Sequence, residues 1–342
     1  MRNALWVVVI TVPVMEDVFT FERLLEICAD KSKLEDFLKE FNLLHTFDGR
    51  CQRCGVGVLY MRSDKSLCDG KNWRCSNKKC TLKYSIRRDS FFEGSKLSII
   101  TILKIVYFWS HGYPLEIVVH ESGISAKTIV DFYNLCREVC GVVLKERSQK
   151  IGGPGKTVEI DESKFGKRYN KGKRIEGVWV FGGIERDTTP VKCFSETVED
   201  RSAATLIPVI KKWIEPGTTI LSDCWKKYSS LEAEGYIHET INHSIEFVRG
   251  NGIHTNNIRS RWCALKKSLP QHGTNKKLFK SHFSEYCIRQ QYLSGDKDKF
   301  LEILKLISTV YHPKNEELLP SSPDDATSFM KLEMDAETCL QV

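Results

Sequence analysis

Four cysteines in two closely spaced pairs constrain the fold of this chain more than any other feature. Cys51 and Cys54 form a C-x2-C pair, and Cys75 and Cys80 follow as a C-x4-C pair. Two such pairs bring four thiolates around one tetrahedral Zn²⁺ ion, whereas buried free thiols need no double pairing. The chain is 342 residues long and its 13 cysteines cannot all be paired, because their number is odd. A long chain with an odd number of cysteines favours metal binding in a reducing compartment over a disulfide scaffold. We therefore expect a structural zinc ribbon over residues 47–92.

The charge of the chain is unevenly distributed. Lys and Arg exceed Asp and Glu by 51 to 44, a net charge of +7, yet residues 315–342 hold seven acids and one lysine. The rest of the chain therefore carries +13, which favours a polyanionic partner such as DNA, although a well-solvated basic surface gives the same charge. The ribbon residues predicted to contact DNA phosphates are Lys78, Lys79, Arg87 and Arg88.

An apolar run of eleven residues, 4–14, follows Arg2 near the start of the chain. No run reaches the roughly 20 residues of a membrane helix, so no membrane partner is expected. The run has the size of a signal-peptide core, but Met15, Glu16 and Asp17 follow it instead of a small-residue cleavage site. Because secretion also conflicts with the cysteine cluster, we expect a chain that is not secreted. We interpret the run as a buried strand, or as a non-native extension with Met15 as the true start.

Helical periodicity follows the ribbon, over residues 93–150. The pattern predicts a short helix, a turn at Gly123, and a second helix capped by Ser125. A helix, a glycine turn and a capped second helix are the outline of a helix-turn-helix, with a plain helical linker as the alternative. Lys127 and Thr128 begin the second helix and are predicted to contact DNA.

The sequence G-G-P-G at 152–155 is the strongest predicted domain boundary. Strand-like runs follow it and then alternate with helices, which is typical of an α/β domain with a mixed sheet. Residues 1–46 are expected to form a helical segment, and 301–342 a C-terminal helix with an acidic disordered tail. The expected strands lie near 158–160, 178–181, 191–194, 218–221 and 237–241, and the expected helices over 203–214 and 258–269.

Two aspartates stand on predicted strands. Asp161 lies in T-V-E-I-D at 157–161, and Asp223 ends T-I-L-S-D at 219–223. Carboxylates at the ends of adjacent strands can hold the divalent cations of two-metal phosphoryl transfer, and such oxygens suit Mg²⁺ or Mn²⁺. Surface or capping acids are the commoner interpretation of strand aspartates. Glu162 should face the opposite side of the strand from Asp161 and is expected to be structural.

Several sequence blocks occur in a fixed order after the G-G-P-G boundary. They are E-I-D-E-S-K-F-G-K at 159–167, G-V-W-V-F-G-G-I-E-R at 177–186, P-G-T-T-I-L-S-D-C-W at 216–225, N-H-S at 242–244, and H-T at 254–255 with Trp262. Together they resemble the Merlin superfamily of DDE transposases and related bacterial insertion-sequence transposases. The similarity covers roughly residues 45–290, including the ribbon. It implies an RNase H-like core of the retroviral-integrase type over 151–300.

The resemblance also implies roles for particular residues. In such transposases three acids hold two metal ions that activate water or a 3′-hydroxyl against a DNA phosphodiester. Asp161 matches the first acid and Asp223 the second, but the expected third glutamate is Arg259, in T-N-N-I-R. A guanidinium cannot ligate a cation and places positive charge where the metal ions would bind. Asn256 or Asn257 could supply a neutral oxygen, since some bacterial relatives have asparagine at the third position.

Two functions are consistent with these features. The favoured one is a transposase-derived DNA-binding protein, a relic or a host-adopted gene, whose DDE core is catalytically impaired by Arg259. The alternative is an active transposase of a mobile element, which would cut terminal inverted repeats and carry out DNA transposition with Asn256 or Asn257 as third ligand. A zinc-ribbon transcription accessory factor would not need the blocks around Asp161 and Asp223. We expect double-stranded DNA as partner, a homodimer, and a location in the nucleus, or in the cytoplasm of a prokaryote.

Overall fold

The computed structural model describes the chain in two compact units. One unit takes the described residues of Met1–Asp30 and Leu103–Leu306, and the other those of Lys31–Ile102 and Ile307–Val342. No described helix is long and apolar enough to cross a membrane. The apolar run at 4–14, the N-H-S block and the acidic tail lie outside the described residues. The described residues are 18–44, 50–147, 149–166, 168–170, 173–175, 177–223, 226–241, 254–269 and 278–311.

A small antiparallel sheet forms the ribbon. Its strands follow the order β1-β2-β3, and both cysteine pairs lie at the end of the sheet where β1 begins and β2 ends. Helix α2 and the last turn of α9 belong to the same unit, in which Tyr311 packs edge-on against Phe91 at 5.7 Å. The elements are α2 (Lys31–Glu40), β1 (Leu59–Ser63), β2 (Lys71–Cys75), β3 (Lys83–Ser85) and α9 (Lys299–Val310).

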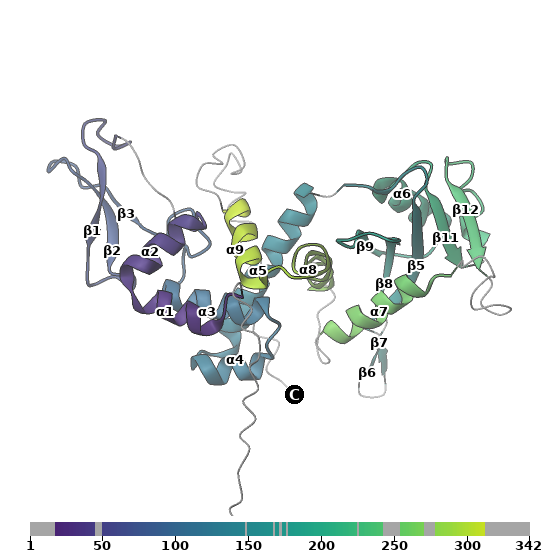
Figure 1. The fold of residues 1–342 in the computed structure, drawn as a ribbon, viewed down its shortest axis with the longest axis horizontal. Coiled ribbons are helices and arrows are strands. Elements are labelled where there is room, and N and C mark those ends of the chain that lie inside the picture. The colour runs from purple at the N-terminus through teal and green to yellow at the C-terminus, as the bar shows by residue number, and fades with distance from the viewer. Residues whose placement is uncertain are drawn as a thin grey trace, which may run out of the picture. The chain divides into compact units, whose positions relative to one another are not determined.

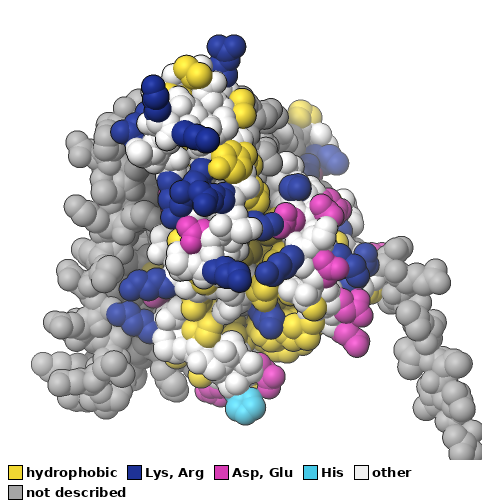
Figure 2. Space-filling model, turned by 90° about the vertical axis from the view of Figure 1, so that its left-hand side faces the viewer, with side chains coloured by type: hydrophobic (Ala, Val, Ile, Leu, Met, Phe, Trp, Pro, Cys, Tyr) yellow, Lys and Arg dark blue, Asp and Glu magenta, His cyan; other side chains and the backbone are white. Residues whose placement is uncertain are grey.

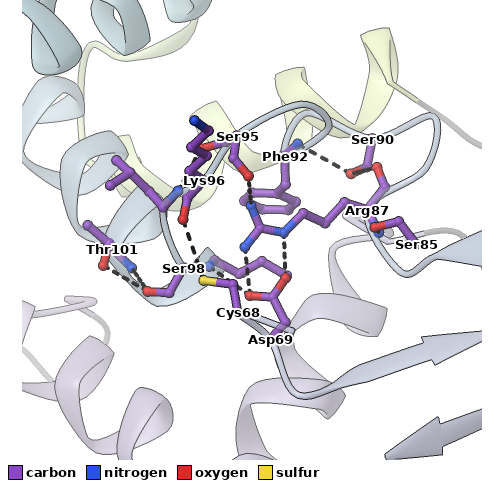
Figure 3. Close-up of polar contacts among 12 residues, drawn as sticks. Cys68, Asp69, Ser85, Arg87, Ser90, Phe92, Ser95, Lys96, Ser98 and Thr101 are labelled. Atoms are coloured by element: carbon purple, nitrogen blue, oxygen red, sulfur yellow. Dashed lines mark hydrogen bonds and ion pairs between the residues drawn. The ribbon is translucent and has the colours of Figure 1, made fainter. Parts of the chain in front are cut away.

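A buried ion pair joins the ribbon to the start of α3 (Ile99–Ser110). The Arg87 side chain is only 6% exposed and donates to both carboxylate oxygens of Asp69 and, at 2.8 Å, to the carbonyl of Ser95 (Figure 3). Asp69 also accepts the backbone N–H of Ile99 at 3.2 Å. A carboxylate at the N-terminus of a helix is favoured by the helix dipole. The pair therefore holds the end of the ribbon against the first turn of α3.

The predicted turn between two helices is confirmed. Gly123 ends α4 (Leu115–Ser122) with a φ of +66°, and the Ser125 hydroxyl accepts the backbone N–H of Thr128 at 3.3 Å. Both are ordinary devices for ending and starting a helix. Helix α5 (Ala126–Arg147) then follows this cap. The helix pair has the outline of a helix-turn-helix.

Helix α8 (Phe279–Tyr292) packs along α5 and closes the end of α3. Arg289 donates to the carbonyl oxygens of Trp109 at 2.7 Å and Ser110 at 2.8 Å, and its guanidinium lies 4.5 Å from the Trp109 ring. Arg137 of α5 pairs with Glu285 of α8 at 3.5 Å. The last carbonyl groups of a helix have no hydrogen-bond donor within the helix. Arg289 supplies such donors to the carbonyl groups at the end of α3.

The predicted mixed sheet is confirmed by the order β12-β11-β5-β8-β9. Strands β5, β8 and β9 are antiparallel neighbours, whereas β11 runs parallel to β5 and β12 parallel to β11 (Figure 1). Three antiparallel strands continued by two parallel ones are the RNase H-like arrangement. The strands are β5 (Thr157–Phe165), β8 (Val178–Glu185), β9 (Cys193–Val198), β11 (Thr219–Asp223) and β12 (Ile237–Ile241).

Each face of this sheet is covered by helices. On one face α6 (Ala203–Trp213) buries its apolar side against Val158, Ile160 and Phe181. On the other, α7 (Asn256–Ser268) and α8 bury Trp262 and their other apolar residues against the opposite sides of β5 and β8. A Cβ on Gly182 would lie 2.6 Å from the Trp262 ring, so this glycine permits the close approach of α7.

Two pairs of short strands were not predicted. β4 (Ile151–Gly152) pairs with β10 (Ile214–Glu215), and β6 (Arg168–Asn170) pairs with β7 (Lys173–Ile175) in a hairpin between β5 and β8. The first pair lies at the G-G-P-G boundary. Both are too short to produce a recognisable strand pattern in the sequence.

Candidate functional site

The four cysteines of the ribbon converge on one point. Their sulfur atoms all lie within 4.8 Å of one another, with 3.8 Å between Cys51 and Cys80 and 3.6 Å between Cys54 and Cys75. Four thiolates bound tetrahedrally at the usual Zn–S length of about 2.3 Å would be separated by roughly 3.8 Å. The four sulfurs thus fit a structural zinc ion, which these cysteines would hold.

The turns around the cysteines are shaped for such a site. The backbone N–H groups of Gly57 and Asn77 donate to the sulfurs of Cys54 and Cys75 at 3.5 and 3.4 Å. The backbone donors lower the pKa of Cys54 to about 6, whereas burial raises the pKa of its neighbour Cys75 to about 12. A Cβ on Gly57 would lie 2.4 Å from the Cys75 sulfur, so only glycine fits there.

Three of the four predicted phosphate-contacting residues of the ribbon lie at its surface. Lys78 and Lys79 are exposed, and the Arg88 guanidinium stacks 4.2 Å from the Tyr84 ring. Arg87, in contrast, is buried against Asp69 and does not form part of the surface. Figure 2 shows Lys and Arg side chains crowding the upper part of the face that carries the ribbon, with Asp and Glu mostly toward its lower right.

The two residues at the start of α5 that were predicted to contact DNA, Lys127 and Thr128, differ in their exposure to solvent. Lys127 is exposed, whereas Thr128 is half-buried and its hydroxyl lies 2.9 Å from that of Ser125. Thr128 is thus part of the N-terminal cap of α5, and Lys127 is the residue of the two that presents a charge to solvent.

The two predicted catalytic aspartates lie on neighbouring strands. The pairing of β11 with β5 runs from Thr219 opposite Thr157 to Leu221 opposite Glu159. Two residues further along both strands, the same register brings Asp223 level with Asp161. Parallel neighbours lie about 4.8 Å apart, so carboxylates level with each other can share a cation.

The pKa shifts of the carboxyl groups near Asp161 agree with the placement of Asp161 and Asp223 on neighbouring strands. Burial raises the pKa of Asp161 to about 6, and the nearby Asp223 contributes in the same direction, while Arg259 opposes the rise. Burial likewise raises the pKa of Glu162 to about 8, with further contributions from the two aspartates. Glu162 accepts a hydrogen bond from the buried Tyr228 hydroxyl. A cluster of partly buried carboxylates is favourable for a cation, and among the described residues Arg259 contributes a positive charge to Asp161.

A fully buried carboxylate that we did not predict anchors the helix carrying Arg259. Glu159 accepts the Ile258 backbone N–H at 3.0 Å and the Asn257 amide at 2.8 Å, both at the start of α7. Arg186 pairs with it at 2.7 Å, and His254 lies 3.6 Å away. Glu159 therefore neutralises the helix N-terminus and fixes its position. The available signal was a second acid two residues before Asp161 in an apolar strand.

The two asparagines proposed as alternative third ligands differ in their surroundings. Asn257 directs its amide nitrogen to Glu159, as described above. Asn256 is exposed at the first position of α7, and its backbone N–H lies 3.4 Å from the His254 ring nitrogen. A role for either residue as a metal ligand stays a prediction.

We expect Glu159→Gln to lower the free energy of unfolding by about 3 kcal/mol, because the change leaves Arg186 and the α7 N-terminus without their buried counter-charge. Urea unfolding followed by tryptophan fluorescence measures this. Glu234→Gln is the control, because its ion pair with Lys211 at 2.6 Å is solvent-exposed and should cost less than about 1 kcal/mol. Equal effects of the two variants would contradict the anchoring role.

Comparison with known proteins supports a transposase relationship for this part of the chain. Residues 151–293 match the family model described as the ISXO2-like transposase domain. An uncharacterized transposase-like protein of Haemophilus influenzae is 28% identical over 95 residues, which are 28% of this chain and 76% of that protein. One solved structure that matches is the cryo-EM structure of the simian T-cell lymphotropic virus intasome in complex with PP2A regulatory subunit B56 gamma. The alignment covers 65% of this chain and 78% of the chain in that structure, with 13% sequence identity and a TM-score of 0.27. That last similarity is too low to support an inference. Residues 151–293 are thus an ISXO2-like DDE transposase domain.

Proposed function

We propose that this chain is a transposase-derived protein that binds duplex DNA through its zinc ribbon and helix-turn-helix-like segment, and that its DDE core is catalytically impaired. The observation that carries the proposal is the pair Asp161 and Asp223, level with each other on β5 and β11, with Arg259 near Asp161 at the third position. The domain type and the RNase H-like sheet support the placement of these residues.

In an active core of this kind, Asp161 and Asp223 would hold Mg²⁺ or Mn²⁺, which supplies the charge that activates the nucleophile and stabilises the leaving oxygen. Here Arg259 supplies a fixed positive charge to the same carboxylates. A guanidinium has no lone pair for a metal ion and stays protonated at every relevant pH. The core then has a partly neutralised acidic centre, which suits binding without cutting.

The structural zinc belongs to the binding function. The ribbon would hold it through Cys51, Cys54, Cys75 and Cys80, and the bound ion would fix the turns that carry Lys78 and Lys79. Phosphate contacts from such bases give affinity without sequence preference. Sequence preference would come from the exposed start of α5 at Lys127.

Duplex DNA binding that weakens steeply with salt is the expected result for the full chain. Each phosphate contact adds about 0.9 to the slope of log K against log salt concentration, so six contacts would lower affinity by about a thousandfold or more between 50 and 200 mM. Fluorescence anisotropy with a labelled 30-base-pair duplex measures this.

A chain ending at residue 314 provides the control for the acidic tail. It lacks seven acids and one lysine, and we expect it to bind DNA at least as tightly as the full chain because a competing negative charge is gone. Binding that is absent at 50 mM salt, or that does not respond to salt, would contradict the proposal.

A further inference from the structure

The edge strand of the zinc ribbon exposes apolar side chains. Strand β1 lies at one side of the order β1-β2-β3. Its Tyr60 is 43% exposed, and Val58, just before the strand, is 52% exposed. A single exposed apolar residue is common in folded proteins, whereas a group of them in a defined chemical setting marks a binding surface. The side chains around Tyr60 therefore decide what this surface can bind.

Cations surround Tyr60 on its face of the sheet. In the strand register Tyr60 lies opposite Arg74 of β2, and Arg74 lies opposite Lys83 of β3. Residues directly opposite each other in antiparallel strands have Cβ atoms about 5 Å apart on the same face. Arg62 is two residues beyond Tyr60 and shares that face, because side chains alternate along a strand. We call this surface, made by Tyr60, Arg62, Arg74 and Lys83, the Tyr60 face.

Asp64 orders two cations of the Tyr60 face. Its carboxylate lies 3.0 Å from the Lys83 ammonium and 3.8 Å from the Arg74 guanidinium. It also accepts a hydrogen bond from the amide of the buried Asn72 at 2.8 Å, which holds the carboxylate in place. Because three cations stand against this one acid, the face stays positive. Figure 2 shows hydrophobic side chains lying among Lys and Arg in the upper part of the face that carries the ribbon.

The other face of the ribbon has a different role. Met61, the residue after Tyr60, is 37% exposed and lies on that face, opposite Trp73. Lys71 of the same face pairs with Glu35 of α2, so this helix contacts the sheet there. One face of the ribbon thus packs against α2, and the other presents an aromatic ring to solvent beside cations.

An exposed aromatic ring among cations is the chemistry that binds unpaired nucleotides. A base stacks on the ring while Lys and Arg contact the neighbouring phosphates. Bases inside a duplex are stacked on one another, so an unpaired base is the partner that offers a free aromatic face. A second copy of this chain is a poor alternative, because symmetric pairing would bring two positive faces together. The ring and the charge together favour a single strand of DNA.

The Tyr60 face is connected to the zinc-binding turn. The backbone N–H of Ser76 donates to the carbonyl of Val58 at 2.9 Å, and the Val58 N–H donates to the Ser76 hydroxyl at 3.0 Å. These bonds join the start of β1 to the turn that carries Lys78 and Lys79. Tyr60 is two residues from Val58, which corresponds to about 7 Å along a strand. The exposed ring and the proposed phosphate contacts therefore lie on one connected part of the ribbon.

We propose that the Tyr60 face binds unpaired nucleotides of a DNA strand, with one base stacked on Tyr60. Its flanking phosphates are contacted by Arg62, Arg74 and Lys83. The inference rests on the proposed DNA-binding function and deepens it, because it names unpaired DNA as a ligand of the ribbon. Stacking accepts every base, so the site adds affinity for single-stranded ends without sequence preference.

The test compares a blunt 30-base-pair duplex with the same duplex carrying a 3′ overhang of six thymidines. Fluorescence anisotropy at 100 mM NaCl should show the unaltered chain binding the overhang duplex at least about fivefold more tightly, the lower end of the effect of stacking one base. Tyr60→Ala should abolish this preference, and Tyr60→Trp should keep it. Met61→Ala is the matched control, because it shortens a similarly exposed neighbour on the other face, and it should keep the preference.

Equal affinities of the unaltered chain for the two probes would overturn the proposal, and so would an undiminished preference in Tyr60→Ala. Sedimentation tests the alternative occupant, since a dimer of the unaltered chain that becomes monomeric in Tyr60→Ala would assign the face to a second copy and overturn the proposal. If the unaltered chain binds neither duplex, the proposed function fails as a whole. If it binds both equally, only the present inference fails.

Crosslinking of the unaltered chain does not depend on folding of the variants. With 5-iododeoxyuridine in place of one overhang thymidine, irradiation should join the DNA to Tyr60, and mass spectrometry of the digested protein identifies the residue. Crosslinks that form only at other residues, under conditions where the overhang duplex is bound, would overturn the assignment.

Discussion

Replacing Cys51 or Cys80 with serine is expected to release one zinc ion per chain and to unfold the ribbon. The free energy of zinc binding at four-cysteine sites is about 10–16 kcal/mol near neutral pH, and it is largely folding free energy. The three short strands of the ribbon bury few side chains, so burial in these strands contributes little in comparison with the zinc. The expected effect therefore exceeds that of any single substitution in the larger core.

Elemental analysis of the purified protein measures the zinc, and limited proteolysis between residues 50 and 92 measures the unfolding. Cys68→Ser is the matched control, because this exposed thiol lies outside the cluster, with its sulfur 3.6 Å from the carbonyl of Lys96. The control should keep its zinc. A Cys80→Ser protein that is metal-free yet as protease-resistant as the unaltered chain would refute the structural role of zinc.

The second large effect concerns Arg259. Replacing it with glutamate changes the charge near Asp161 by two units. At an effective dielectric constant of about 20 and a separation of about 4 Å, each pair of unit charges is worth on the order of 4 kcal/mol. Even half of that would change metal affinity more than tenfold. We therefore expect the unaltered chain to bind Mn²⁺ weakly at this site and Arg259→Glu to bind it at least tenfold more tightly.

Isothermal titration with Mn²⁺ measures the difference. Arg259→Gln separates charge from ligation, because glutamine removes the cation without supplying an anion, and it should fall between the other two. Arg259→Glu combined with Asp161→Asn should lose the gain, since the first ligand is then neutral. Identical Mn²⁺ titrations for the unaltered chain and Arg259→Glu would refute the account of Arg259.

Local patterns in the sequence predict much of this architecture. The cysteine spacing alone predicts the four-sulfur cluster, because both pairs lie in short turns. Ser125 and Gly123 predict the turn between α4 and α5, because capping depends on neighbouring residues. The alternation around Val158 predicts β5, since side chains of a strand point in turn to opposite faces.

Contacts between residues far apart in the sequence were not predictable in this way. Glu159 and Ile258 are separated by 99 positions, and no local pattern indicates that a strand acid caps a distant helix. The burial of Arg87 was not predictable either. Its sequence neighbours Lys83 and Arg88 suggest a basic surface, but Arg87 forms a buried ion pair with Asp69. Composition counts charges and does not determine which of them are buried.

Cutting of DNA is the property that tests the central claim most directly. Nicking of supercoiled plasmid in Mg²⁺ or Mn²⁺ requires no knowledge of a target sequence, and it is compared for the unaltered chain, Asp161→Asn, Arg259→Glu, and Arg259→Glu with Asp161→Asn. We predict no metal-dependent nicking by the unaltered chain, and that any activity gained in Arg259→Glu disappears when Asp161 is replaced. Robust nicking by the unaltered chain that is lost in Asp161→Asn would contradict the account and would assign the third ligand to Asn256, Asn257 or another acid.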